Sequence, residues 1–252
     1  MSISVCLMAF VFLLSSSFQN KKNAKKSSFA TVKITFNNTV KSSKIALFDS
    51  LYTNPFGEKY SINKFRYYVS NISLKSGEKD FNDKKYYLVD ESNIESQSIF
   101  LSVPQGNYFS INFLLGVDSL HNVSGAQTGA LDPTKDMFWT WNTGYVMAKL
   151  EGNSPSSTLV NHKYEFHVGG FSGKYKVLKQ IHLDFPENKS IQFLKDKTTE
   201  IVINADVNAW WQNPNEIKIE EHANITAPGQ WALAISDNYA KMFSIEKIIY
   251  NN

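Results

Sequence analysis

The histidines are the residues of this chain best suited to bind a metal. Imidazole is a ligand for copper and zinc, but a site needs several such ligands to converge. His167 stands near the end of an expected strand, just before a Gly-Gly turn, and alternation places it on the face opposite Phe166 and Val168. We expect two of the five histidines, His162 and His182, to lie on the surface. The other three are candidate metal ligands: His121, His167 and His222.

The second unusual feature is a tryptophan-rich stretch, Met137–Tyr145 (MFWTWNTGY). Trp139 and Trp141 stand two positions apart, so in a strand they would share one face. Three interpretations remain open. The two rings are core residues, a stacking platform for sugars, or an aromatic wall beside a metal.

Motifs of well-known enzymes are missing. The segment Gly169–Lys174 (GGFSGK) is one residue too short for a phosphate-binding loop, and Tyr175 stands where a hydroxyl residue would bind magnesium. There is no Gly-x-Ser-x-Gly elbow and no His-Glu-x-x-His helix. Asp132 and Asp136 are too weak a pair to suggest glycoside hydrolysis. We therefore expect a protein that is not an enzyme.

The elements that must position these residues are short strands. From Thr31 the polarity alternates with a period of two, which predicts that Val32, Ile34 and Phe36 point inwards. Similar segments recur with turn residues between them, and only two short helical pieces are expected, at 209–211 and 237–242. The pattern predicts an all-β fold, an antiparallel β-sandwich of immunoglobulin-like or Greek-key type. The expected strands after the first are 65–74, 86–89, 99–103, 108–115, 145–150, 164–168, 177–185, 200–207 and 243–250.

The first residues differ from the rest. Residues 5–14 form an apolar run of ten, too short to span a membrane, followed by three serines and four lysines. We interpret residues 1–28 as a signal peptide with a Lys-rich lead-in, and residues 29–252 as one domain. No basic residue precedes the run, which is atypical of a signal. The mature chain would then be periplasmic or secreted, without a transmembrane segment.

Composition narrows the function further. The only cysteine, Cys6, lies in the expected signal, so the domain has no disulfide and no thiolate chemistry. The formal charge is +3, but the four lysines at 21–26 account for all of the excess. The domain itself is close to neutral, so we expect no nucleic-acid binding.

Several blocks together resemble the MbnP family. They are Phe65–Ile72 (FRYYVSNI), Gly129–Pro133 (GALDP), the tryptophan-rich stretch, Lys149–Gly152 (KLEG), Phe166–Gly169 (FHVG) and the closing 238–243. Their order and spacing make the resemblance specific, and they cover nearly the whole expected mature chain.

The resemblance implies a secreted or periplasmic β-sandwich that binds copper. In some members a tryptophan of the Trp-rich motif is oxidised to kynurenine, in a reaction linked to a dihaem partner of the MauG type. Carried over to this sequence, Trp139 is the first candidate for that residue and Trp141 the second. His167 is the motif histidine, and His121 or His222 would complete the copper site. Some members have a histidine close to the modified tryptophan, whereas this chain has none there.

Two functions of different kinds therefore stand. The first is an exported, non-enzymatic copper-binding or copper-handling protein of the MbnP type. The alternative is an aromatic-rich module without metal, which presents its tryptophans to a carbohydrate or a protein: Trp139, Trp141, Trp210 and Trp211. Convergence of histidines near Trp139 would favour copper, and exposed indole rings would favour the sugar.

Overall fold

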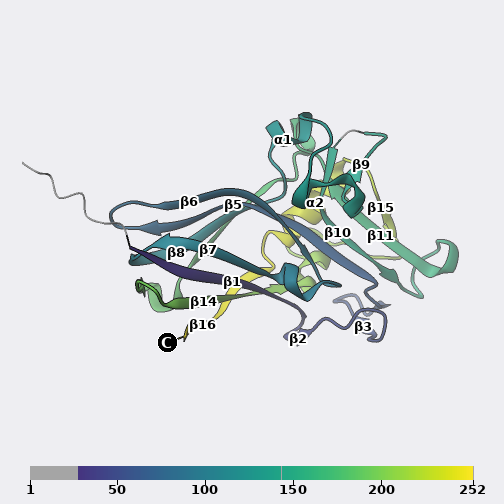
Figure 1. Ribbon diagram of the computed structural model, residues 1–252. Coiled ribbons are helices and arrows are strands. Elements are labelled where there is room, and N and C mark those ends of the chain that lie inside the picture. The colour runs from purple at the N-terminus through teal and green to yellow at the C-terminus, as the bar shows by residue number, and fades with distance from the viewer. Residues whose placement is uncertain (1–27, 143, 252) are drawn as a thin grey trace, which may run out of the picture.

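Two packed β-sheets make up most of the molecule (Figure 1). The computed structural model describes residues 28–142 and 144–251. The predicted all-β sandwich is confirmed, although two strand pairs within it, β1 with β14 and β11 with β15, run parallel. Apart from Ser28, the expected signal segment lies outside the described residues. Within them, no helix has the length and apolar character needed to cross a membrane.

The smaller of the two main sheets has the strand order β16-β14-β1-β2, with β7 paired to β1. Its first strand confirms the predicted register. Val32 and Ile34 are fully buried and Phe36 nearly so, while the residues between them stay partly exposed. The strands are β1 (Phe29–Val40), β2 (Ser43–Lys44), β7 (Ser98–Pro104), β14 (Thr198–Asp206) and β16 (Phe243–Asn251).

The larger sheet has the order β12-β8-β5-β10-β11-β15, and three more strands pair with it: β13 with β8, β6 with β5, and β9 with β10. A separate hairpin joins β3 to β4. The strands are β3 (Tyr52–Thr53), β4 (Lys59–Tyr60), β5 (Lys64–Ser76), β6 (Phe81–Asp90), β8 (Gly106–Leu115), β9 (Phe138–Trp139), β10 (Gly144–Asn153), β11 (Lys163–Gly169), β12 (Lys179–Asp184), β13 (Ile191–Phe193) and β15 (Asn224–Ile225).

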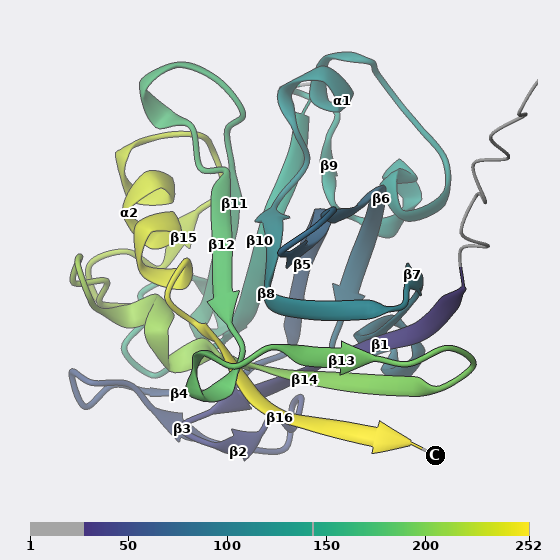
Figure 2. The same cartoon turned by 90° about the vertical axis from the view of Figure 1, so that its left-hand side faces the viewer.

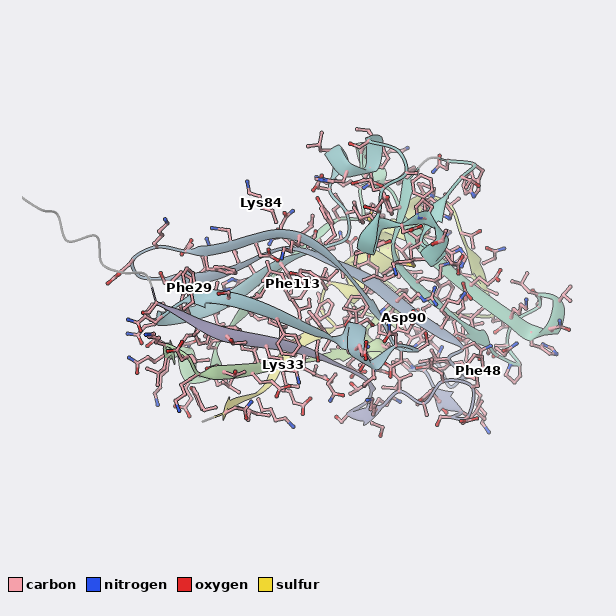
Figure 3. The ribbon with its side chains drawn as sticks, in the orientation of Figure 1. Phe29, Lys33, Phe48, Lys84, Asp90 and Phe113 are labelled. Atoms are coloured by element: carbon pink, nitrogen blue, oxygen red, sulfur yellow. The ribbon has the colours of Figure 1, made fainter. Side chains whose placement is uncertain are left out.

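Aromatic side chains fill the space between the sheets. Phe36 of β1 meets Tyr67 of β5, Phe113 of β8 and Phe243 of β16 edge-on, with ring centroids 5.9, 5.8 and 6.2 Å apart. Edge-to-face contacts of this kind stabilise a core beyond the burial of area. Figure 3 shows Phe113 between the layers, whereas Lys84 on β6 points away from the sheet.

Helices are short, as predicted. The expected piece at 209–211 lies inside η7, but the one at 237–242 was placed too late, because the helix α2 already begins at Gln230 after a Gly229 that offers no side-chain cap. Figure 2 shows α2 beside β11 and β15. The helices are α1 (Ser119–Val123), α2 (Gln230–Tyr239) and the 3-10 turns η1 (Ile94–Gln97), η2 (Gly129–Leu131), η3 (Pro133–Lys135), η4 (Val160–His162), η5 (Gly173–Tyr175), η6 (Pro186–Asn188) and η7 (Val207–Trp211).

Candidate functional site

A pocket of about 420 Å³ lies where β9, β10 and β11 meet the loop before β9 and the segment after β15. We call it the tryptophan pocket. It combines indole rings with an ammonium group, a carboxylate and an imidazole, a mixture that suits binding more than structure alone. Its lining residues are Asp136, Phe138, Trp139, Trp141, Val146, Lys149, His167 and Thr226.

The two tryptophans do not share a strand face, so that prediction was wrong. β9 ends at Trp139, which pairs with Gly144, and the chain turns between them, placing Trp141 in the turn. Trp139 is 7% exposed and Trp141 is 65% exposed. Their ring centroids are nevertheless 5.4 Å apart, because the tight hairpin brings the turn back over the strand end.

Gly169 joins the tryptophan block to the Phe-His-Val-Gly block. A Cβ atom added at this glycine would lie 2.4 Å from Cζ3 and 2.5 Å from Cη2 of Trp139. The indole therefore rests directly on the backbone of β11, where only glycine leaves room. The contact places Trp139 against Gly169, which stands two residues after His167 in β11.

Charged side chains of three neighbouring strands form the floor beside the rings. In the register of the sheet, Lys149 of β10 stands opposite His167 of β11, and Glu151 of β10 opposite Lys64 of β5. His167 Nε2 lies 2.8 Å from Glu151 Oε1. Lys149 Nζ donates to the backbone oxygen of Asp136 at 2.5 Å and lies 3.0 Å from its carboxylate. We call these five residues the ionic ladder.

Burial and neighbouring charges shift the pKa values of the two carboxylates of the ionic ladder in opposite directions. Burial alone would raise the pKa of Glu151, but the hydrogen bond with His167 and the charges of Lys64 and Lys149 overcome it and lower that pKa to about 2. For Asp136 burial is likewise outweighed by the same two lysines, which lower its pKa. Both carboxylates are thus ionised at neutral pH, and two ammonium groups neutralise them.

The lowered pKa of Glu151 predicts a dependence of stability on acid. Its pKa falls from 4.5 to about 2 on folding, so its contribution is fully present above pH 4.5 and is lost as the pH drops towards 2. After allowance for solvent screening we expect about 1–2 kcal/mol. Urea unfolding of the wild type and Glu151→Gln should show a stability gap that narrows from pH 5 to pH 2. A gap that stays constant over this range would contradict it.

The three histidines proposed as ligands do not all reach the pocket. His167 lines it, and its prediction as a residue beside Trp139 is consistent with this placement. His121 lies in α1 and contacts Tyr86 of β6 and Asp118. His222 precedes β15 and stacks on Trp231 of α2, with ring centroids 3.7 Å apart. Neither His121 nor His222 is among the pocket's lining residues.

The pocket's donors fit copper in kind but not in number. His167 supplies one imidazole and Asp136 one carboxylate, ligand types that copper(II) accepts. The ammonium groups of Lys64 and Lys149 oppose a cation at the carboxylates. Across residues 28–142 and 144–251, no three or more His, Cys, Asp and Glu side chains are grouped to hold one metal ion. The pocket alone therefore offers part of a coordination sphere.

Sequence reasoning did not place Lys149 and Asp136 in the site. The sequence contains an indication for Lys149, because this lysine interrupts the otherwise apolar run 145–150. A lysine in a buried strand requires a counter-charge. The Lys149 side chain is only 3% exposed. Asp136 gave no such signal, since its position depends on the left-handed turn, φ 58°, that ends η3.

Fold and site together define a two-layer β-sandwich that carries a tryptophan hairpin clamped on a glycine of the neighbouring strand. The chain belongs to the MbnP family, whose profile matches residues 29–228. The solved structure of MbnP from Methylosinus trichosporium is similar over 88% of this chain and 99% of that one, with 12% identity and a TM-score of 0.50. At this identity the likeness shows the fold alone. No curated protein matches the sequence.

Proposed function

We propose that the chain is an exported, non-enzymatic member of the MbnP family that handles copper at the tryptophan pocket, in the periplasm or outside the cell. One observation supports this most strongly. His167 and Trp139, which come from separate sequence blocks, line the same pocket. An imidazole beside an indole is the pairing that the family resemblance implies for copper.

In this proposal each residue has a separate role. His167 is the imidazole ligand, and Glu151 orients its ring through the 2.8 Å hydrogen bond, as carboxylates commonly do for metal-bound histidines. Copper, when bound, supplies a redox-active Lewis acid.

The tryptophan chemistry implied by the family belongs to the same proposal. Trp139 is the residue that a dihaem partner of the MauG type would oxidise to kynurenine, with Trp141 second. The two rings are in contact, and Trp141 is the exposed one. A partner would therefore meet Trp141 first. Mass spectrometry of the tryptic peptide from the native host tests the idea, and two unmodified tryptophans would remove it.

Copper titration is the central test of the proposed function. We expect His167→Ala to weaken copper binding at the pocket by at least about tenfold, since the only imidazole there is lost. His182→Ala is a matched control, because this histidine is exposed and bonds to Asn112 and Asp184 on β8 and β12. Isothermal titration with Cu²⁺ provides the measurement. Equal affinities of wild type and His167→Ala would remove His167 from the site.

A metal-free binding module is the second candidate, favoured by the exposure of Trp141. Two other tryptophans proposed for that role, Trp210 and Trp211, are completely buried and cannot present their rings. The module would therefore bind through Trp141 alone at the pocket rim. Quenching of indole fluorescence by oligosaccharides in the presence of EDTA, lost in Trp141→Ala and kept in Trp231→Ala, would favour this candidate.

A further inference from the structure

A second group of metal-ligating side chains lies apart from the tryptophan pocket. Tyr86 comes from β6, and Asp118 and His121 come from the start of α1, in the segment 116–138. We call these three residues the tyrosine cluster. None of them lines the tryptophan pocket, and none belongs to the ionic ladder.

Three donor atoms of the cluster meet at one point. Nδ1 of His121 lies 2.6 Å from Oη of Tyr86, and 3.0 and 3.1 Å from the two carboxylate oxygens of Asp118. Oη of Tyr86 is also in direct contact with Oδ2 of Asp118. Each of the three atoms therefore touches the other two.

Counting protons shows that this triangle is under-supplied with donors. The phenol carries one proton, the neutral imidazole has one for its two nitrogens, and the ionised carboxylate has none. At most two protons are available for the three contacts between these side chains. At least one contact therefore has no proton of its own, and its two lone pairs face each other unless it shares a proton with a neighbouring contact. A cation at the centre removes this conflict, because it accepts a lone pair from each atom.

The spacing also suits one ion. Ligands at about 2.0–2.2 Å from a metal stand roughly 3 Å from each other, close to the 2.6 to 3.1 Å seen between His121 Nδ1 and its neighbours. Tyr86 Oη and Asp118 Oδ2, which are in direct contact, would have to move apart to reach this spacing when an ion binds. Imidazole, carboxylate and phenolate together select a divalent first-row transition ion, for which copper(II) has the highest affinity. We propose that Tyr86, Asp118 and His121 form a second metal site, independent of His167.

The surroundings hold the cluster in place. The backbone N–H of His121 donates to Asp118 Oδ1 at 3.0 Å, which fixes the carboxylate. Asn122 donates to the backbone oxygens of Val117 and Asp118 and accepts from the N–H of Tyr145, which ties α1 to β10. The side chains of His121 and Asp118 are 36% and 30% exposed, so an ion can enter from solvent.

A spectroscopic titration in the His167→Ala background tests the site alone. Copper(II) bound to a phenolate absorbs in the visible, so adding Cu²⁺ should produce such a band at one equivalent. Tyr86→Phe should abolish the band, and His121→Ala should weaken binding by at least about a hundredfold. Tyr87→Phe is the matched control, since the neighbouring tyrosine donates to Asp83 but has no imidazole partner. Circular dichroism checks that each variant is folded.

Clear outcomes separate this proposal from the proposed function. A band that is absent at saturating Cu²⁺, or that persists in Tyr86→Phe, would overturn the second site. Loss of the band in Tyr87→Phe would overturn it too. Because His167 is already removed in this background, a negative result at the tyrosine cluster does not argue against copper binding at the tryptophan pocket. Equal copper affinities of wild type and His167→Ala would in turn not argue against a metal site at the tyrosine cluster.

Discussion

Replacing Gly169 with alanine is expected to destabilise the protein by about 3 kcal/mol and to displace the indole of Trp139. The new methyl group would lie 2.4 to 2.5 Å from two ring atoms, and 3.1 Å from the backbone oxygen of Tyr145. A ring on a two-residue strand has little freedom to move away without opening the hairpin. Urea unfolding measures the cost, and a red shift of indole fluorescence reports the displaced ring.

A matched control and a double variant isolate the cause. Gly229 has an extended backbone and no atom within 4 Å of an added Cβ, so Gly229→Ala should leave stability nearly unchanged. In a Trp139→Ala background, Gly169→Ala should cost much less than in the wild type, because the clashing ring is gone. If the cost is the same in both backgrounds, the clash with Trp139 is not the reason for the glycine.

Lys149→Met is expected to destabilise the fold by about 1–3 kcal/mol, because it removes a buried ammonium group and leaves the half-buried carboxylate of Glu151 and the exposed carboxylate of Asp136 behind. The Lys149 side chain is 3% exposed, and its ammonium group and that of Lys64 are the lysine counter-charges of Asp136 and Glu151. Its loss should also raise the pKa of Glu151 above about 2. Denaturant unfolding and NMR titration of the Glu151 carboxyl measure the two effects.

An exposed lysine of the same sheet provides the comparison. Lys84 of β6 points into solvent (Figure 3), and Lys84→Met should change stability by less than about 0.5 kcal/mol. If Lys149→Met is no more costly than Lys84→Met, the ladder is not held together by charge. An unchanged Glu151 pKa in Lys149→Met would show that His167 and Lys64 suffice to keep the carboxyl ionised.

The fold could be predicted because the alternation of polar and apolar residues that marks a strand is a local property of the sequence. Alternation from Thr31 to Phe36 follows from the period of a strand, and the buried side chains of β1 confirm it. The predicted bounds of the long strands after the first lie within three residues of the observed ones, except that β6 begins five residues earlier than predicted. The short strands β2, β3, β4, β13 and β15 were missed, since two or three residues are too few to show a period.

The site could be predicted only in part. The family resemblance connected Trp139 with His167, and the structure supplies the physical reason: the ring of Trp139 rests on Gly169 of the block that contains His167. The separation of Trp139 from Trp141 could not be read from their spacing. It depends on where β9 ends, and the pairing of Trp139 with Gly144 sets that end.

The sequence by itself determined the sandwich, the inward face of its first strand and the family of the protein. Only the tertiary structure decided which charged and imidazole groups meet. The strand register sets Lys149 opposite His167 and Glu151 opposite Lys64, while α1 carries His121 to Tyr86 instead of to the tryptophans. The physical reason is that periodicity fixes which face a residue occupies, but long-range pairing between strands and loops fixes its neighbours.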